Sequence, residues 1–208
     1  MKYFADFSQG KWKEEDFWHA GFCSISHRKP FEQEDDCIKN GYAPCGFKPD
    51  LEKMKSGAEE IVGMDRNEYA FTVYVNKQKF KSDIILTSDF AFEEFGAPTF
   101  LYGEGVEWDG GICLAKTHIE VTLWEEGINY WHNELENNAN KVNLIKHDKF
   151  ELAGGRHHIK IIFKKTGIEV CLNGRNSSLD YNLYDEGYIG FIGCEGMNRF
   201  YNLEIIGT

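Results

Sequence analysis

The sequence lacks the features that mark several common classes of protein. No apolar run approaches the roughly 18–20 residues of a membrane-spanning helix. No cluster of Lys or Arg stands out, and 34 acidic against 23 basic residues give a net charge of −11. Nucleic acids and anionic membranes are bound through cationic patches, so the composition argues against both of these partners. Neutral ligands, cations and other proteins remain open.

Motifs for several kinds of chemistry are also missing. The sequence contains neither a G-x-x-x-x-G-K phosphate loop nor the nucleophile elbow of serine hydrolases. The seven histidines show no metal-ligand spacing and the six cysteines form no Cys-x-x-Cys pair, so no zinc site is expected. Widely spread cysteines are typical of reduced, buried thiols in a cytoplasmic protein. The segment from Met1 to Phe7 lacks the apolar core of a secretory signal, which favours the same location.

What the sequence has in abundance is strand-like patterning. Its 208 residues include 21 glycines, four prolines and 15% aromatic residues, which is typical of a turn-rich globular protein. Helical patterns occur only at Asp50–Glu60 and Asn133–Asn140, and residues 23–66 are expected to form long loops. The pattern predicts an all-β sandwich or jelly roll with little helix, folded as a single domain over residues 1–208. The predicted strands are Tyr3–Phe7, Glu68–Asn76, Lys81–Phe92, Thr99–Tyr102, Gly111–Leu114, His118–Glu125, Ile128–Asn133, His158–Lys165, Ile168–Asn173, Gly187–Cys194 and Asn198–Ile206.

Two hairpins can be predicted in detail, because in each a glycine separates two alternating segments. The first is expected to turn at Glu126-Gly127 and the second at Thr166-Gly167, with glycine supplying a positive φ. A three-residue loop with a bulge in the first hairpin would move its second strand to the other face. The two-residue turn separates apolar from polar side chains better and is preferred. It places Ile119, Val121, Leu123, Ile128 and Tyr130 on one face and Glu120, Thr122, Trp124, Asn129, Trp131 and Asn133 on the other.

Four consecutive segments of the C-terminal half form a familiar pattern, namely Gly155–Ile161, Ile168–Gly174, Gly187–Phe191 and Phe200–Ile205. They resemble the H-x-I-x-I, x-N-G, G-x-I-G-F and F-x-N-L-x-I strands of the concanavalin A-like lectin/glucanase superfamily. The resemblance implies a concanavalin A-like jelly-roll β-sandwich of two antiparallel sheets, in which the first strand pairs with the last. Members of the superfamily include lectins, carbohydrate-binding modules, glycoside hydrolases, polysaccharide lyases and laminin G-like modules, so the fold alone does not define the activity.

The polar face of the first predicted hairpin has the composition of a carbohydrate-binding site. The apolar face of a pyranose ring stacks on an indole, and its hydroxyl groups bond to amides and carboxylates. Trp124 and Trp131 are therefore predicted to stack on a sugar, unless both rings belong to the core between the sheets. Asp89 is added because an Asp within so regular a strand needs a partner or a ligand if it is buried. The residues expected to bind the sugar hydroxyls are Glu120, Asn129, Asn133 and Asp89.

The same hairpin invites comparison with the E-x-D-x-x-E signature of retaining glucanases in this superfamily. There the first Glu is the nucleophile, the last is the acid/base, and a bulge brings both to one face. In this sequence Thr122 stands where the signature has Asp, and Glu120 and Glu125 are separated by an odd offset. Without a bulge the two carboxylates point to opposite faces, whereas retaining chemistry needs them about 5–5.5 Å apart. The pair is a weak catalytic candidate.

Other carboxylates gather in segments predicted to be loops. Glu104, Glu107 and Asp109 surround Trp108 and are expected to form an acidic rim near the hairpin face. Such a rim could supply a catalytic acid, with Trp108 contributing to sugar binding, or could simply be solvated. The acidic run at residues 32–36 offers oxygen ligands of the kind that Ca²⁺ prefers, but it lacks the alternating spacing of a calcium loop. Calcium is the one cofactor that the sequence suggests, through this acidic run.

These observations lead to a carbohydrate-binding protein that could also process its ligand. The first alternative is a glycoside hydrolase, or a polysaccharide or oligosaccharide lyase, acting through the weak catalytic candidates. The second is a laminin G-like module that binds other proteins. The expected partner is a carbohydrate, with neither nucleic acid nor membrane, and the sequence does not define the oligomeric state. The catalytic candidates are Glu120, Glu104, Glu107 and Asp109; the carbohydrate-binding candidates are Trp124, Trp131, Glu120, Asn129, Asn133, Asp89 and Trp108.

Overall fold

The computed structural model of the chain describes residues 1–22, 31–41, 71–93, 96–109, 112–136, 139–194 and 196–207. In 20–22, 41, 105–109, 112–116, 135–136 and 139–140 it describes the strand backbone and not the side chains. The helix expected at Asp50–Glu60 and most of the loops expected over residues 23–66 lie outside the described residues. Within the described ranges no helix is long and apolar enough to cross a membrane.

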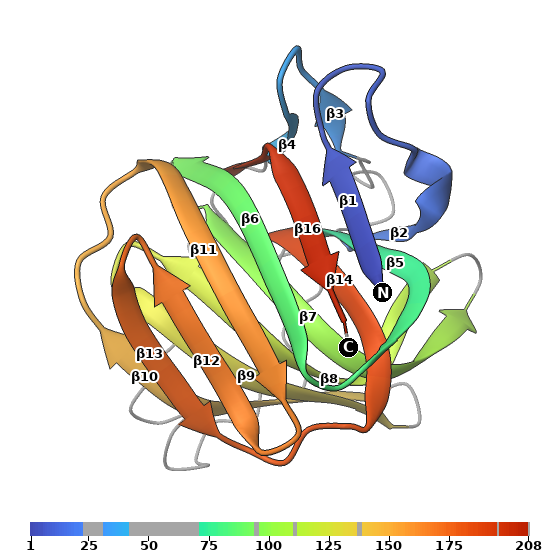
Figure 1. Cartoon of the computed structure of the whole chain (residues 1–208), viewed down its shortest axis with the longest axis vertical. Helices are drawn as coiled ribbons and strands as arrows, with labels where there is room; N and C mark the ends of the chain where they lie inside the picture. The colour runs from blue at the N-terminus through green and yellow to red at the C-terminus, as the bar shows by residue number, and fades with distance from the viewer. Residues whose placement is uncertain are drawn as a thin grey trace.

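The described residues form two antiparallel sheets that lie face to face (Figure 1), which confirms the predicted β-sandwich. A single 3₁₀ turn, η1 (Glu14–Asp16), accompanies the strands in the described ranges. Sheet A consists of β1 (Lys2–Asp6), β3 (Glu32–Gln33), β4 (Ile38–Gly41), β6 (Ile84–Glu93), β11 (Gly155–Lys164), β12 (Gly167–Leu172), β13 (Arg175–Asp180), β15 (Met197–Phe200) and β16 (Asn202–Ile206). Sheet B consists of β2 (Phe17–Phe22), β5 (Phe71–Lys81), β7 (Ala97–Asp109), β8 (Ile112–Trp124), β9 (Gly127–Glu136), β10 (Ala139–Lys149) and β14 (Glu186–Cys194).

The order of the strands brings distant parts of the chain together. Sheet A runs β13-β12-β11-β6-β15-β4-β3, with β16 beside β6 and β1 beside β16. Sheet B runs β10-β9-β8-β7-β14-β5-β2. The first and last strands pair over their whole length, from Lys2 opposite Ile206 to Asp6 opposite Asn202, as expected. The two ends of the chain therefore lie side by side (Figure 1).

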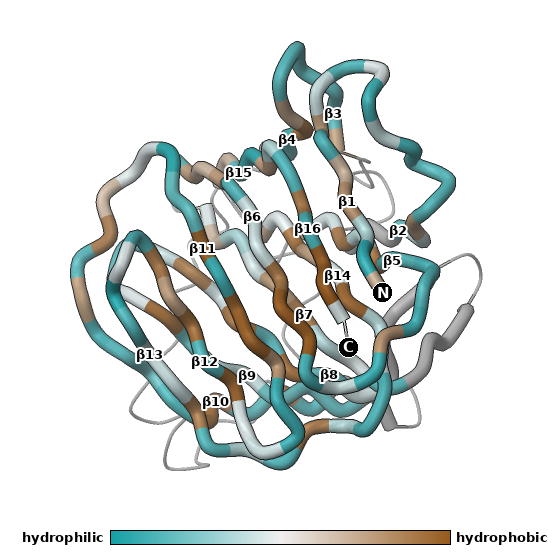
Figure 2. Tube along the Cα trace, viewed as in Figure 1, coloured by the Kyte–Doolittle hydropathy of each residue, from teal (hydrophilic) through white to brown (hydrophobic). Residues whose placement is uncertain are grey.

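The core lies between the two sheets and is built from alternate residues of their strands. Apolar side chains therefore recur along the strands that cover one another (Figure 2). The largest fully buried side chains are aromatic, which accounts for much of the aromatic content of the chain. They include Tyr74, Tyr102, Tyr130, Phe7, Phe80, Phe90, Phe100, Phe163, Phe191 and Phe200.

Both predicted hairpins form, with each turn one residue earlier than expected. Trp124 lies opposite Gly127, so the first turn is Glu125-Glu126, and Lys164 lies opposite Gly167 in the second. Each glycine is thus the first residue of the returning strand. A Cβ on Gly127 would lie 2.1 Å from the backbone oxygen of Asp148 in β10, and a Cβ on Gly167 would lie 2.5 Å from that of Leu179 in β13. Close approach of the next strand requires these glycines.

Besides residues 32–33 and 38–41, which form strands β3 and β4 where loops are expected, two local expectations are wrong. The segment expected to be helical, Asn133–Asn140, instead contributes the end of β9 and the start of β10, which pair from Ala139 opposite Glu136 onward. The acidic rim expected as a loop is part of the long strand β7, where Glu104 lies opposite Thr117 of β8. In both places pairing with a neighbouring strand overrides the local preference of polar residues for turns or helix.

A buried histidine, His157, joins the start of β11 to the core. Its ring stacks on Phe92 at 5.6 Å between centroids, and Nε2 donates to the carbonyl of Ala153 at 2.8 Å. Nδ1 accepts from the side-chain amide of Asn173 at 2.7 Å. Burial lowers the pKa of His157 below 6.5, so the ring is neutral in the fold.

We predict that Gly127→Ala destabilises the fold by about 2–4 kcal/mol, because the new methyl group meets the Asp148 carbonyl and φ is +130°. Gly10→Ala is the matched control, since Gly10 has φ +75° and no atom within 4 Å of an added Cβ. It should cost only about 1 kcal/mol. Urea denaturation of both variants measures the difference. Equal losses would contradict the close approach of β10.

We predict that His157 makes the fold less stable as the pH falls below about 6.5. The folded pKa is lowered, so the unfolded chain binds the proton more readily, and acid favours unfolding. His157→Gln can keep both hydrogen bonds without titrating, and should therefore show a smaller loss of unfolding free energy between pH 7.5 and pH 5. Identical pH profiles for the two proteins would rule out this role.

Candidate functional site

The predicted polar face of the β8–β9 hairpin lies on the outward face of sheet B. Ile119, Val121 and Tyr130 are fully buried in the core between the sheets, so alternate residues must point the other way. The shift of the turn changes the predicted pairing by two residues and leaves each side chain on its predicted face. The outward set is therefore as expected and contains Glu120, Thr122, Trp124, Asn129, Trp131 and Asn133.

The pairing register fixes which outward residues are neighbours. A row of residues crosses all seven strands of sheet B at the level of Glu120, and a second row crosses five strands at the level of His118. The outward face thus carries an aromatic residue on each side of its central strands. The first row reads Trp18, Val75, Gly190, Leu101, Glu120, Trp131, Leu144, and the second reads Tyr188, Gly103, His118, Asn133, Val142.

Three hydrogen-bonded pairs tie polar side chains together on this face. His118 Nε2 lies 2.9 Å from Glu120 Oε1, within one strand at an offset of two residues. Thr99 Oγ1 donates to Thr122 Oγ1 at 2.9 Å. Asn129 Oδ1 lies 2.6 Å from Nδ1 of His147 in β10. Sequence patterns do not predict these partners, although the offset of two residues between His118 and Glu120 is a signal for one of them.

Two donors on the same face are buried and have no hydrogen-bond partner among the residues that the structure describes. They are the indole Nε1 of Trp124 and the side-chain Nδ2 of Asn133. Native proteins satisfy the great majority of buried polar atoms, and an unsatisfied one costs about 1–3 kcal/mol. Trp124 lies next to the turn and Asn133 lies opposite His118, so the two donors flank the Glu120 row. Both donor atoms are inaccessible to solvent, so a ligand rich in hydroxyl groups bonds to them only when the side chains that cover them move aside.

The two tryptophans lie in different surroundings. Trp131 is 8% exposed and packs with Leu144 and Val142 of β10 on the outward face, apart from the core between the sheets. Trp124 is only half-buried, and its ring lies 6.1 Å from that of His147. Trp131 lies opposite Glu120 of β8. Glu120 is four residues from Trp124 along the same strand, a separation of about 13 Å. One sugar ring cannot contact both.

Glu120 and Glu104, the catalytic candidates whose side chains the structure describes, are not brought together. The register of β8 is unbroken from Thr117 to Trp124, and Glu125 lies in the turn, so no bulge aligns Glu125 with Glu120. Glu104 is an odd number of residues from Leu101, which lies opposite Glu120, and so belongs to the other face. The backbones of Glu107, Trp108 and Asp109 continue β7, and their side chains are outside the described set.

Asp89 lies in β6 of sheet A, in the other layer of the sandwich. Its carboxylate meets His158 Nδ1 at 2.7 Å, Asn202 Nδ2 at 3.1 Å and Arg156 at 3.3 Å. Partial burial raises the pKa of Asp89, but the hydrogen bonds from these three residues outweigh it and hold the pKa below its usual value. The partner expected for Asp89 exists, and it is a cluster on sheet A. Asp89 cannot share a ligand with Trp124.

Glu34, in the middle of the acidic run at residues 32–36, is engaged in ion pairs. Glu34 pairs with Lys39 and, at 3.4 Å, with Arg199. The hydrogen bond from Lys39 dominates and lowers the pKa of Glu34. Among the residues that the structure describes, no group of three or more His, Cys, Asp or Glu side chains is placed to hold a metal ion.

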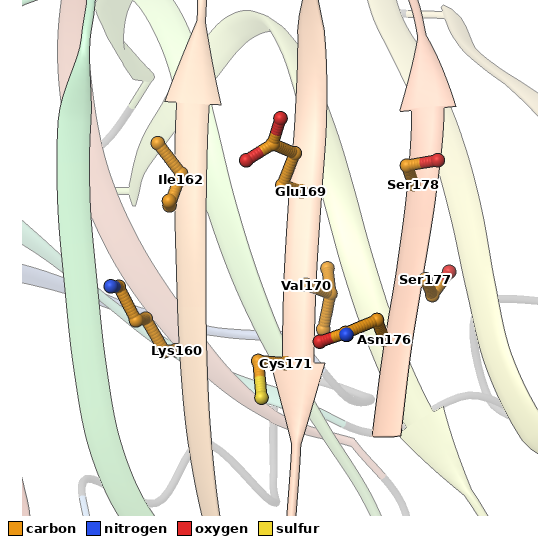
Figure 3. A pocket seen from close by; sticks show the side chains of 8 residues that line it. All are labelled: Lys160, Ile162, Glu169, Val170, Cys171, Asn176, Ser177 and Ser178. Carbon is orange, nitrogen blue, oxygen red and sulfur yellow. The ribbon is translucent and has the colours of Figure 1, made fainter. Parts of the chain in front are cut away.

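A shallow hollow of about 490 Å³ lies on sheet A, where sequence patterns gave no signal (Figure 3). Lys160 of β11 lies opposite Cys171 of β12, which in turn lies opposite Asn176 of β13. Glu169, which lines the same hollow, is paired with Lys164. The hollow is open and lined by mixed polar side chains, and it lies on the other sheet from the β8–β9 hairpin.

Comparison with known proteins identifies the fold. No family model and no curated protein matches the sequence. An endo-β-1,3-glucanase from Pyrococcus furiosus superposes with a TM-score of 0.58 at 9% identity, covering 98% of this chain and 92% of that chain. A galectin-like protein of unknown function from Bacillus subtilis gives 0.57 at 11% identity, covering 98% and 94%. A carbohydrate-binding module from the same organism gives 0.52 at 14% identity, covering 70% and 91%.

The chain therefore has the concanavalin A-like jelly-roll fold that its C-terminal motifs suggested. At these identities the likeness defines the fold and leaves the function to the site.

We predict that Trp124→Phe costs little stability, because it removes a buried donor that has no partner. Trp12→Phe is the matched control, since Trp12 Nε1 donates to Gln33 Oε1 at 2.7 Å. The same change there leaves an acceptor unpaired and should cost about 1–3 kcal/mol more than Trp124→Phe. Thermal and urea denaturation measure both. A larger loss for Trp124→Phe would show that its N–H is bonded within the fold.

Proposed function

We propose that this protein binds a carbohydrate on the outward face of sheet B, around Trp124 and the Glu120 row. The observation that carries the proposal is the pair of buried donors without partners, Trp124 Nε1 and Asn133 Nδ2, on the same face as the Glu120 carboxylate. Sugar hydroxyls and ring oxygens accept hydrogen bonds from such donors, and hydroxyls donate to a carboxylate.

Within this site the residues have different roles. Trp124 offers a half-buried indole that can stack on the apolar face of a sugar. Glu120 accepts from hydroxyls while His118 holds its carboxylate in place. Asn129, held by His147, and Trp131, packed under Leu144, are buried and form the floor. Trp131 thus stabilises the site by packing against Leu144 and does not offer a second surface on which a sugar stacks.

The arrangement favours binding over hydrolysis. Glycoside hydrolysis ordinarily needs two carboxyl groups about 5–9.5 Å apart. The direct neighbours of Glu120 on its face are His118, Thr122, Leu101 and Trp131, and none of them is an acid. The polar row can therefore hold a sugar without a second carboxylate beside the first.

The proteins of similar structure and the composition of the chain also support carbohydrate binding, without pointing to particular residues. One neighbour is described as a carbohydrate-binding module and another as an endo-β-1,3-glucanase, so the same fold serves both sugar binding and sugar cleavage. The charge of −11 disfavours anionic polymers, which leaves neutral oligosaccharides as the expected ligands. We place their recognition in the cytoplasm, because Cys37, Cys171 and Cys194 are free thiols, as is usual in a reducing compartment.

The proposal is tested on an array of neutral oligosaccharides that includes β-1,3-glucans, followed by calorimetry with any sugar retained. Trp124→Phe should lower affinity at least about tenfold while the fold remains stable, because one hydrogen bond and part of the stacking surface are lost. Glu120→Gln should also weaken binding, and neither wild type nor variants should release reducing ends.

Asp89→Asn is the control, because Asp89 lies in the other sheet and the change should leave affinity unaltered. The proposal fails if no sugar is retained. It also fails if Asp89→Asn and Trp124→Phe weaken binding equally, since the bound sugar would then not depend on sheet B.

A further inference from the structure

The edge strand β1 is the centre of the exposed apolar surface in the described part of the chain. The exposed large hydrophobic residues of this surface are Met1, Phe4 and Ile206, and Phe4 is 57% exposed. Phe4 is the middle residue of β1, Met1 precedes the strand, and Ile206 lies opposite Lys2 on β16. Apolar side chains gathered on one edge of a sheet point to a surface that another strand covers.

The backbone of β1 is prepared for such a strand. Among the described strands β1 pairs with β16 alone. Met1 exchanges both hydrogen bonds with Gly207, and the amide of Phe7 donates to the carbonyl of Tyr201. The backbone N–H and C=O groups of the odd-numbered residues of β1 therefore point towards β16. By alternation the N–H and C=O groups of Lys2, Phe4 and Asp6 point to the edge of β1 that no described strand covers.

Other edge strands of the sandwich carry devices that block pairing. In β10, the outer strand of sheet B, the register shifts between Leu144 and Lys146. Lys146 Nζ also donates to the carbonyl of Ser178 at 2.6 Å, on the outer strand β13 of sheet A. Bulges and lysines of this kind prevent edge-to-edge association. The centre of β1 instead carries an exposed phenylalanine.

We propose that two copies of this chain pair through β1, antiparallel, about a two-fold axis at Phe4. The strand is complementary to itself, because it begins with Lys2 and ends with Asp6. In this register Lys2 of each copy lies opposite Asp6 of the other, and the two Phe4 side chains meet at the axis. All outward N–H and C=O groups of Lys2, Phe4 and Asp6 are then paired.

The existing contacts of these residues leave room for the pairing. Lys2 meets Glu204 at 2.6 Å and Lys11 meets Asp6 at 3.1 Å, with both lysines more than 60% exposed. Exposed ion pairs contribute about 0–1 kcal/mol and can be shared or exchanged. One short strand pair buries little surface, so the dimer should be weak, with a Kd of roughly 1–100 μM. Pairing occurs within sheet A and leaves the outward face of sheet B uncovered.

Sedimentation velocity of the untagged protein, from about 2 μM to 0.5 mM, tests the proposal. The wild type should shift from monomer to dimer with concentration. Phe4→Pro removes an N–H that points away from β16, so the fold keeps its own hydrogen bonds while the dimer loses two. It should weaken dimerisation at least about tenfold. Phe4→Lys tests the same contact if the proline variant unfolds by circular dichroism.

Ile206→Ser is the control for general stickiness, because β16 is paired on both sides and the variant should still dimerise. Lys2→Asp and Asp6→Lys should each weaken self-association, and an equimolar mixture of the two should form a heterodimer. A wild type that stays monomeric at 0.5 mM overturns the proposal. So does association that survives Phe4→Pro and Phe4→Lys, or that disappears in Ile206→Ser.

Discussion

The stacking of the inward faces of the two sheets is the constraint from which the rest of the molecule follows. A sheet buries alternate residues, so each strand that contributes to this core must present its other residues outward. Ile119, Val121 and Tyr130 enter the core, and Glu120 and Asn129 are thereby fixed on the opposite face. The positions of the candidate binding residues are thus a consequence of core packing, with the hydrogen bonds on the outer face adding orientation.

Alternation explains which predictions from the sequence succeeded. Both hairpin turns were placed one residue too late, yet every side chain was assigned to its correct face, because the pairing changed by two residues. Gly127 and Gly167 misled the placement, since their neighbours β10 and β13 demand a small residue and a turn is only one reason for glycine. A pattern of period two is robust to such an error. The outward set of the β8–β9 hairpin could therefore be predicted in full.

Other features depend on contacts that no local pattern contains. The regular strand around Asp89 suggests a place beside the tryptophans. That strand, β6, instead lies between β11 and β15 in sheet A, and a local pattern does not show to which sheet a strand belongs. The partners of Glu120 and Asn129 were missed for two different reasons. His118 was available as a same-face neighbour, whereas His147 reaches Asn129 only through the shifted register of β10. The acidic segment of β7 has the polar composition of a loop. Its pairing with β8 makes it a strand, and a local pattern does not contain that pairing.

The outward face of sheet B is the part of the molecule on which the proposed binding depends. Along β5 and β14 it buries its own apolar layer, with Val73, Val75 and Ile192 nearly inaccessible. Towards β8 and β9 the same face changes to hydrogen-bonded pairs and to donors without partners. Each such donor costs about 1–3 kcal/mol in the unbound protein. A polyhydroxylated ligand that reaches the donors of Trp124 and Asn133 recovers that free energy on binding. The unsatisfied groups therefore favour the bound state most strongly for ligands rich in acceptors.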